Sequence, residues 1–146
     1  MSRGFAAIGL DNPKSGVNIG SVFRAAGVYE AKLIVLGGPR PEKITRFQTD
    51  TMRTWKHTPV ILTDDIFDAL PFDTVPIAVD LLPDATPLME FTHPERAFYI
   101  FGAEDSTLDE RIVKRCAHTV YVPTKHCMNL AAAVNVVLYD RLAKRS

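Results

Sequence analysis

Asn18-Ile-Gly-Ser-Val-Phe-Arg24 opens a helical pattern directly after an apolar run and a turn, and this stretch decides the fold. Its apolar residues recur at the spacing that gives a helix one buried face. The run before it, Phe5–Leu10, is typical of a buried strand. The connection between them contains Asp, Asn, Pro and Gly, which are turn formers. A strand, a turn and a helix in this order predict the first unit of an α/β domain.

The same stretch places a glycine and an arginine close together on the predicted helix. Gly20 lies one turn before Arg24 on the predicted helix. Because Gly20 has no side chain, a phosphate backbone can approach it, while the guanidinium of Arg24 offers a planar fork of donors. The pair therefore predicts an anion site. The alternative is an ordinary helix start, with Asn18 as its N-cap and Arg24 extending into solvent.

The rest of the chain alternates between apolar, β-branched-rich runs and helical patterns. The predicted strands are Phe5–Leu10, Leu33–Leu36, Val60–Leu62, Val75–Val79, Phe98–Phe101 and Thr119–Val122. The predicted helices are Asn18–Tyr29, Asp64–Leu70, Leu108–Cys116 and Asn129–Lys144. Strands that are apolar on both faces and separated by helices indicate an α/β fold, with a largely parallel sheet and helices on both faces. We predict one domain over residues 1–146, with ligands at the carboxyl ends of the strands and a long loop at Leu82–Pro94.

Composition limits the classes of function. Seventeen basic residues balance seventeen acidic ones, so the net charge predicts no general affinity for nucleic acid. Two cysteines cannot form a disulfide framework, and the N-terminal residues lead into a strand and not into a signal peptide. No apolar run reaches the length that spans a membrane. We therefore expect a cytoplasmic protein without a membrane partner.

One local concentration of positive charge lies between Arg40 and His57. Five basic residues outnumber two acidic ones there, and Phe47 and Trp55 are interleaved with them. Basic and aromatic side chains together suit a phosphate backbone and a stacked base. The segment is equally typical of a solvated connection whose Trp55 fills a gap in the core. Both interpretations stay open.

Two further segments follow predicted strands. In Phe101-Gly102-Ala103-Glu104-Asp105, Gly102 allows close approach of a ligand, and Glu104 is a natural partner for Arg24. Alternatively, the acidic pair only favours the positive end of the next helix. The other segment runs from Val122 to Asn129 and opens an Ala-rich helix. Asn129 is either the N-cap of that helix or a polar group directed into a ligand pocket.

These three segments, in this order and at strand ends, resemble the motifs of SpoU/TrmH-type RNA methyltransferases of the SPOUT superfamily. The first motif, Asn-x-Gly-x-x-x-Arg, matches Asn18, Gly20 and Arg24. The second, a Gly-x-Glu after an apolar strand, matches Gly102 and Glu104. The third, a Pro-bearing strand end followed by Ser-Leu/Met-Asn and an Ala-rich helix, resembles Pro123 and Cys127-Met128-Asn129. The resemblance covers nearly the whole chain.

The resemblance implies features of the fold and an activity that the periodicity of the sequence cannot indicate. It implies a C-terminal trefoil knot, a homodimer, S-adenosylmethionine as methyl donor, and a ribose 2′-hydroxyl of tRNA or rRNA as acceptor. It places the cofactor against Val79, Leu81, Gly102, Val122, Cys127 and Met128. It assigns catalysis to Arg24, with Asn18, Glu104 and Asn129 holding Arg24 and the substrate sugar. An arginine is effectively always protonated, so we interpret Arg24 as a clamp on phosphate that stabilises a developing alkoxide.

Three departures from the family pattern bear on this hypothesis. Cys127 stands where the family usually has serine, and a thiol is a weaker hydrogen-bonding group than a hydroxyl. The loop from Pro123 to Cys127 is short and lacks glycine, and Thr107 replaces the usual glycine of the second motif. The cysteines and neighbouring histidines have no familiar zinc-site spacing, so no metal site is expected.

Two other functions stay open. The departures would suit a knotted RNA-binding module that has no methyl transfer. The neutral net charge would suit an α/β enzyme that binds a phosphorylated small molecule at the helix of Arg24. The sequence names neither the RNA nor the modified nucleotide.

Overall fold

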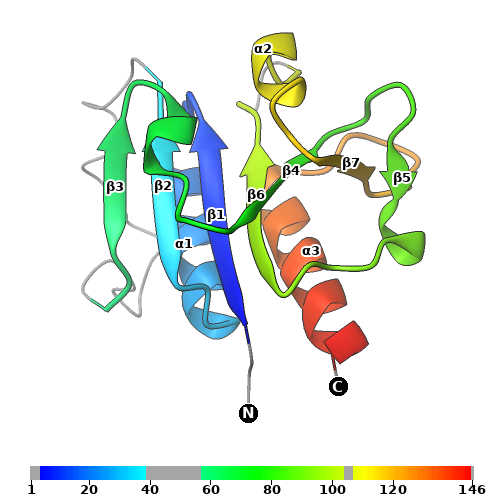
Figure 1. Cartoon of the computed structure of the whole chain (residues 1–146), viewed down its shortest axis with the longest axis horizontal. Coiled ribbons are helices and arrows are strands. Elements are labelled where there is room, and N and C mark those ends of the chain that lie inside the picture. The colour runs from blue at the N-terminus through cyan, green and yellow to red at the C-terminus, as the bar shows by residue number, and fades with distance from the viewer. Residues whose placement is uncertain (1–3, 39–56, 104–106, 146) are drawn as a thin grey trace.

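The computed structural model describes residues 4–38, 57–103 and 107–145. They form a seven-stranded sheet in the order β3-β2-β1-β6-β4-β7-β5, in which all neighbouring strands are parallel (Figure 1). The strands are β1 Phe5–Asp11, β2 Leu33–Gly37, β3 Val60–Thr63, β4 Val75–Val79, β5 Thr86–Pro87, β6 Arg96–Phe101 and β7 His118–Tyr121. The predicted α/β class and parallel sheet are confirmed.

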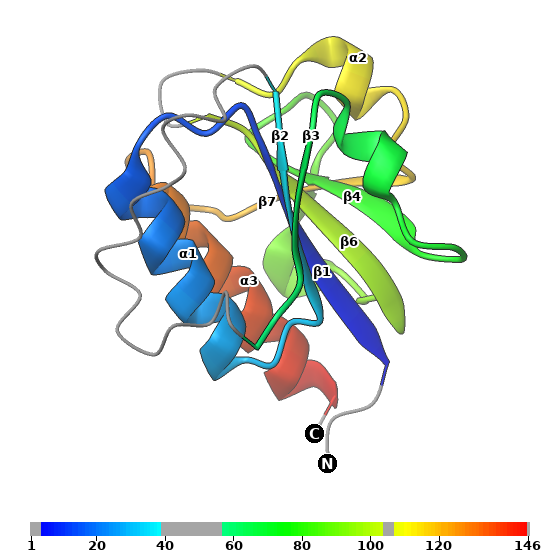
Figure 2. The ribbon, with the colours of Figure 1, turned by 90° about the vertical axis from the view of Figure 1, so that its left-hand side faces the viewer.

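Helices cover both faces of this sheet, as predicted. The two long helices, α1 (Gly16–Val28) and α3 (Leu130–Arg145), lie side by side on one face (Figure 2). The short elements η3 (Ile66–Ala69) and α2 (Glu110–Val113) lie on the other face. A second 3-10 turn, η4 (Leu88–Glu90), follows β5. The trefoil knot stays a prediction.

The core has two layers, one on each face of the sheet. Ile8 and Leu10 of β1 pack with Phe23 under the long helices. Phe98 of β6 packs with Ile66 of η3 on the opposite face. Burial on both faces explains why the strands read as continuous apolar runs and not as alternating ones. Each fully buried aliphatic or aromatic side chain contributes about 1.5–3 kcal/mol of transfer free energy, so these layers hold the strand ends in place.

Two predicted helices are much shorter in the structure. The pattern at Asp64–Leu70 forms only η3, because the proline at position 71 disfavours a helical conformation at Leu70, which is extended. The pattern at Leu108–Cys116 forms only the four residues of α2. The chain then turns toward β7, where the backbone N–H of Ala117 donates to the Pro76 carbonyl at 2.8 Å.

The predicted long loop at Leu82–Pro94 is interrupted by two short elements that the sequence did not indicate. The segment contains β5, which pairs with β7, and η4. Lys144 of α3 fixes it further, since its Nζ donates to the carbonyls of Leu88 and Phe91, both at 2.7 Å. The basic segment from Arg40 falls almost entirely outside the described residues. Among the described helices, none is long and apolar enough to cross a membrane.

Candidate active site

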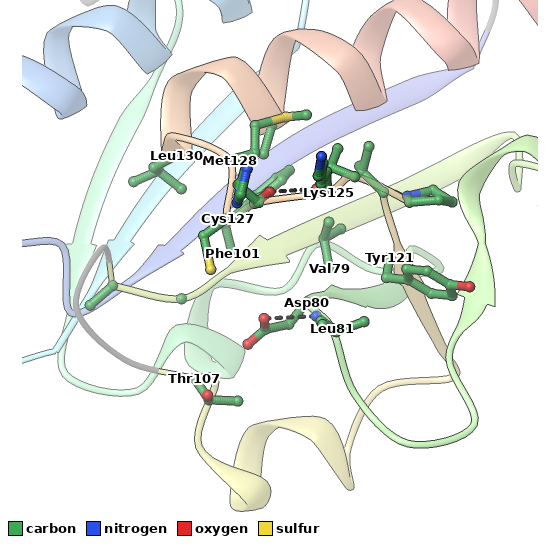
Figure 3. A pocket seen from close by; sticks show the side chains of 17 residues that line it. Val79, Asp80, Leu81, Phe101, Thr107, Tyr121, Lys125, Cys127, Met128 and Leu130 are labelled. Carbon is green, nitrogen blue, oxygen red and sulfur yellow. Dashed lines mark hydrogen bonds between the residues drawn. The ribbon is translucent and has the colours of Figure 1, made fainter.

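A pocket of about 960 Å³ opens at the carboxyl ends of β4, β6 and β7, which are neighbours in the sheet. Its walls include Val79 and Leu81 after β4, Gly102 after β6, and Val122, Cys127 and Met128 after β7 (Figure 3). The structure therefore brings together all the residues that were predicted to hold a cofactor, from three segments far apart in the chain. This is where the carboxyl-end rule for parallel sheets places a ligand.

The connection from β7 to α3 forms one side of the pocket. Lys125, His126 and Cys127 are exposed along it. Thr124 stabilises the turn, because its Oγ1 donates to the His126 carbonyl at 2.6 Å. Leu130, at the first turn of α3, is buried below the pocket and anchors the end of the connection. The chain thus presents a thiol and two basic side chains at the pocket's edge.

Asp80 is a pocket residue that the sequence interpretation missed. Its Oδ1 accepts the backbone N–H of Leu81 and its Oδ2 accepts that of Leu108, each at 2.8 Å. Leu81 lies in the wall of the pocket, and Leu108 supports the wall at Gly102. A signal was present in the sequence, because an aspartate directly follows the apolar strand at Val79.

Gly102, directly after β6, lies close against Leu108, just before α2. A Cβ added there would lie 3.3 Å from the backbone nitrogen of Leu108 and 3.3 Å from its Cγ. Such contacts are tighter than real Cβ atoms normally make, so the fold favours glycine at this wall. Leu108 is only 5% exposed and fills the core below the connection.

Asn129 fulfils the first of the two roles that the sequence left open, the N-cap, and it is not among the residues that line the pocket. Its Oδ1 accepts the backbone N–H groups of Ala131 and Ala132, at 2.9 and 3.2 Å, and so caps α3. Its Nδ2 donates to Asn18 Oδ1 of α1 at 3.1 Å. Two of the predicted catalytic residues are therefore in direct contact, although they lie 111 positions apart.

The interpretation of Asn18 as the cap of α1 was wrong. Ser15 is the N-cap, with an extended backbone and a side chain that accepts the N–H of Asn18 at 3.3 Å. The helix begins at Gly16, so Asn18 lies inside its first turn. A serine offers the cap oxygen two residues before the helical pattern becomes apolar, which moves the start toward the N-terminus. This leaves the Asn18 side chain available to contact Asn129.

Arg24 is exposed on α1 and does not line the described pocket. The buried side of the same helix includes Gly20 and Phe23, so Arg24 lies on the outer face. Glu104 lies outside the described residues, and its predicted pairing with Arg24 stays a prediction. The structure therefore joins Asn18 to Asn129, and Arg24 is not among the residues that line the pocket.

Of the groups with raised pKa values, one lies at the carboxyl end of β1 and another just before the start of β7. Burial raises the pKa of Asp11 at the end of β1, and the carboxylates of Asp109 and Asp65 add to the effect, while Arg111 opposes it. Burial raises the pKa of the Cys116 thiol to about 11, which makes it a poor nucleophile. No cluster of three or more potential metal ligands occurs within residues 4–38, 57–103 and 107–145.

The sequence comparisons give a family match over most of the chain. A family model described as the SpoU rRNA Methylase family matches residues 6–139. The chain belongs to this family. No curated protein shows significant similarity to this member of the SpoU family.

Solved structures share the fold of this SpoU-family chain. The SpoU methyltransferase AviRb from Streptomyces viridochromogenes, in complex with AdoMet, superposes with a TM-score of 0.86 at 20% identity, over 99% of this chain and 59% of that chain. The TrmH/SpoU tRNA modifying enzyme from A. aeolicus gives 0.86 at 16%, over 99% and 77%. A structure described in connection with 2-OH methylation of C/U34 on tRNA gives 0.81 at 24%, over 97% of each chain. The chain spans about three fifths of the AviRb chain.

Proposed function

We propose that this SpoU-family chain is an S-adenosylmethionine-dependent RNA methyltransferase, acting on a ribose 2′-hydroxyl of tRNA or rRNA. One observation carries the proposal. The residues expected to hold the cofactor, which come from three separate segments, line a single pocket at the carboxyl ends of β4, β6 and β7. We assign residues 1–146 to one methyltransferase domain with a trefoil knot, working in the cytoplasm.

The residues of the pocket fit such a cofactor. Its volume of about 960 Å³ falls within the range of about 300–1,000 Å³ that small-molecule pockets span. Phe101, Tyr121 and Leu130 provide apolar walls for an adenine ring. Lys125 provides a positive charge for the carboxylate of the amino-acid end. When bound, S-adenosylmethionine supplies a methyl group carried on positively charged sulfur.

The chain's own residues would then act on the RNA. Arg24 is exposed on α1, the helix that the Asn18–Asn129 contact joins to the start of α3, and we assign its guanidinium to a substrate phosphate, where it would stabilise the alkoxide that develops on the 2′-oxygen. The hydroxyl proton would pass to phosphate or water, because a guanidinium cannot accept it. The Asn18–Asn129 contact would hold the helix of Arg24 against the cofactor loop, and Glu104 is assigned to the support of Arg24.

We include a homodimer in the proposal. The outer face of α3 exposes Val136, Tyr139 and Leu142, which recur every three residues and so share one side of the helix. Val17 of the adjacent α1 is also exposed. Apolar helix faces of this kind are typical of interfaces between identical subunits.

Because the chain has no net positive charge, RNA binding would depend on local basic groups such as Lys125 and Arg24.

The test combines calorimetry with methyl transfer. We expect the unaltered chain to bind S-adenosylmethionine at one site and to methylate RNA from a strain that lacks its gene, with a 2′-O-methyl nucleoside detected by mass spectrometry. Leu81 is 77% exposed in the pocket wall, so Leu81→Arg should fold and should weaken cofactor binding by about tenfold or more. The matched control is Met89→Arg, 67% exposed in the same β4–β6 connection and outside the pocket lining, which should bind normally.

Each other outcome selects a different function. Cofactor and RNA binding without a methylated product would favour the RNA-binding module. Tight binding of a phosphorylated small molecule, without RNA or S-adenosylmethionine binding, would favour the α/β enzyme. If Met89→Arg weakens binding as much as Leu81→Arg does, the pocket is not the cofactor site.

A further inference from the structure

Asp80 occupies a central place in the pocket wall. It follows β4 directly, and its backbone N–H donates to the Val120 carbonyl of β7 at 3.0 Å. The backbone of Asp80 is therefore held by the sheet, and its side chain starts from a fixed point. Its carboxylate is half-buried at the floor between the β4–β5 and β6–α2 connections (Figure 3).

Each carboxylate oxygen of Asp80 accepts a backbone N–H from a different connection. Oδ1 accepts from Leu81, at the start of the β4–β5 connection, and Oδ2 accepts from Leu108, at the end of the β6–α2 connection. Hydrogen bonds to an ionised acceptor are stronger than neutral ones, and both distances are 2.8 Å. One side chain thus fixes two segments that lie 27 positions apart, 108 − 81.

Both segments contribute to the pocket. Leu81 is in its wall, and Leu108 supports the wall at Gly102, where the two residues are so close that a Cβ would meet the Leu108 nitrogen at 3.3 Å. If Leu108 were displaced, its backbone would shift where it packs against Gly102, and this wall of the pocket would change. The carboxylate has its two oxygens engaged with backbone, which favours an indirect role over direct contact with a ligand.

We propose that Asp80 is a positioning residue that preorganises the cofactor pocket by holding the backbone of Leu81 and Leu108. This inference rests on the proposed use of S-adenosylmethionine. Preorganisation raises affinity because the walls need no ordering when the ligand binds. Asp80 acts through the two walls, so it should affect the methyl donor and its demethylated product, S-adenosylhomocysteine, to the same extent.

Asp80→Asn tests the inference in the full chain. The amide keeps one acceptor oxygen but replaces the other with an N–H₂ donor, so one backbone N–H loses its partner. We expect affinity for S-adenosylmethionine and for S-adenosylhomocysteine to fall by about tenfold each, as for loss of one hydrogen bond to a charged group. Hydrogen exchange at the amides of Leu81 or Leu108 should accelerate in the absence of ligand.

The control is Asp84→Asn, in the same connection. Asp84 is exposed and has a backbone φ of 63°, which asparagine tolerates well. It should leave the affinities and both amides unchanged. Asp80→Glu is a second variant, because it keeps the charge and moves the oxygens by one methylene. Positioning predicts that Asp80→Glu also loses affinity, and full affinity in this variant would overturn the inference.

Three further results would also contradict a positioning role for Asp80. Unchanged affinity in Asp80→Asn, with fast amide exchange, would reduce Asp80 to a structural residue. A much larger loss for S-adenosylmethionine than for S-adenosylhomocysteine would point to direct contact with the sulfonium charge, against positioning. Absence of binding by the unaltered chain would overturn the proposed function itself, and the role of Asp80 with it.

Discussion

The side-chain amide of Asn129, which caps α3, donates to Asn18 Oδ1 in the first turn of α1 at 3.1 Å. The oxygen of the Asn129 amide is already engaged by two backbone N–H groups of α3. Only its N–H₂ group is left to face Asn18, so the cap fixes the direction of the contact between helices. Helix initiation and the placement of α1 against α3 therefore depend on the same side chain.

Asn129→Ala should lower the free energy of unfolding by about 1–2 kcal/mol, because it removes the cap and the contact with Asn18 together. Asn129→Asp keeps the cap oxygens and places negative charge at the helix N-terminus, so its loss should be smaller. Denaturant unfolding measures both. The control is Asn135→Ala, since the Asn135 amide donates only within α3, to the Ala131 carbonyl. Equal stability of Asn129→Ala and Asn135→Ala would contradict this account.

Elements with strong local patterns could be predicted from the sequence. Buried strands such as β1 and β6 read as apolar runs, and α1 and α3 have the helical period, although the N-cap of α1 lies three residues before the predicted one. The gathering of the predicted cofactor-binding residues around one pocket agrees with the motif resemblance and with the rule that parallel strands present their carboxyl ends together. Gly102 and Cys127 could therefore be placed at one pocket although they are far apart in the chain.

Elements that depend on distant partners could not be predicted. β5 contains only Thr86 and Pro87, and it exists because β7 pairs with it and Lys144 fixes the following turn. The role of Asp80 depends on Leu108, 28 positions away. The close packing of η3 on β1 depends on a distant glycine, since a Cβ on Gly9 would lie 2.7 Å from Ile66 Cδ1. No local pattern contains these contacts.

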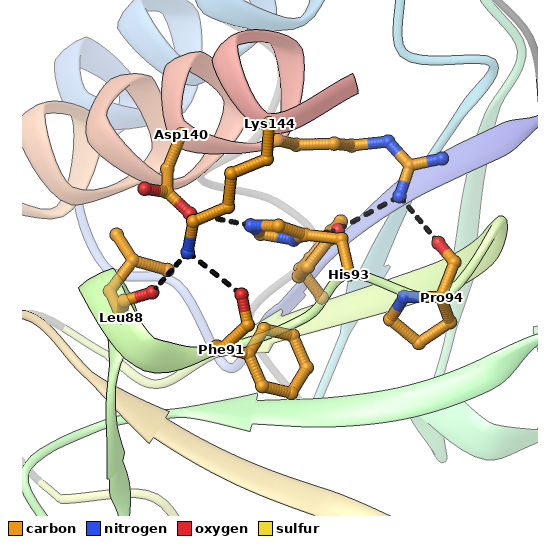
Figure 4. A network of polar contacts seen from close by, with 8 residues as sticks. Leu88, Phe91, His93, Pro94, Asp140 and Lys144 are labelled. Carbon is orange, nitrogen blue, oxygen red and sulfur yellow. Dashed lines mark hydrogen bonds and ion pairs between the residues drawn. The ribbon is translucent and has the colours of Figure 1, made fainter. Parts of the chain in front are cut away.

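A partly buried polar network joins α3 to the connection before β6 (Figure 4). His93 Nδ1 lies 2.7 Å from the Tyr99 hydroxyl, and His93 Nε2 lies 2.7 Å from Asp140 Oδ2. Arg141 donates to the Tyr99 hydroxyl, and Lys144 pairs with Asp140. A neutral ring satisfies every group, because Tyr99 donates to Nδ1 while Nε2–H donates to Asp140. Protonation of His93 would leave the Tyr99 proton without this acceptor.

Stability should fall in mild acid because of His93. Burial lowers the pKa of His93 below its usual 6.5, with Asp140 opposing the shift and Lys144 and Arg141 adding to it. The unfolded chain therefore binds this proton more readily, so the stabilisation is present above pH 6.5 and is lost as pH falls through the folded-state pKa. The free energy of unfolding should decrease between about pH 7.5 and about pH 5.5.

The His93 contribution can be isolated by substitution. His93→Gln does not titrate, so most of the pH dependence in that window should disappear. His126→Gln, at an exposed position of the β7–α3 connection, should keep it. Asp140 should not contribute in this window, because burial raises its pKa but hydrogen bonds from Lys144 and His93 outweigh that effect and hold it below 3.8. An unchanged slope in His93→Gln would assign the dependence elsewhere.

Tyr139 tests the proposed dimer. It is 59% exposed in the middle of the apolar stripe of α3, so Tyr139→Glu places a charge in the interface without changing the core. Light scattering should give twice the chain mass for the unaltered protein and one chain mass for the variant. Phe72→Glu is the control, because Phe72 is 92% exposed in the connection before β4 and should not affect assembly. An unaltered protein that is monomeric at micromolar concentration would exclude the dimer.

Substitution of Arg24 distinguishes a role in catalysis from a role in supporting the fold. It is exposed on α1 and lies outside the cofactor pocket, so Arg24→Ala should leave S-adenosylmethionine affinity and stability nearly unchanged. Methyl transfer should fall by on the order of 10²-fold or more, as when one transition-state donor is removed. Arg24→Lys should not restore transfer, because lysine keeps the charge but lacks the planar fork that holds a phosphate at two points. Lys32→Ala, which removes an exposed cation after α1, is the matched control and should transfer normally. Substantial recovery in Arg24→Lys would indicate simple charge attraction, and wild-type transfer in Arg24→Ala would show that this side chain has no part in the reaction.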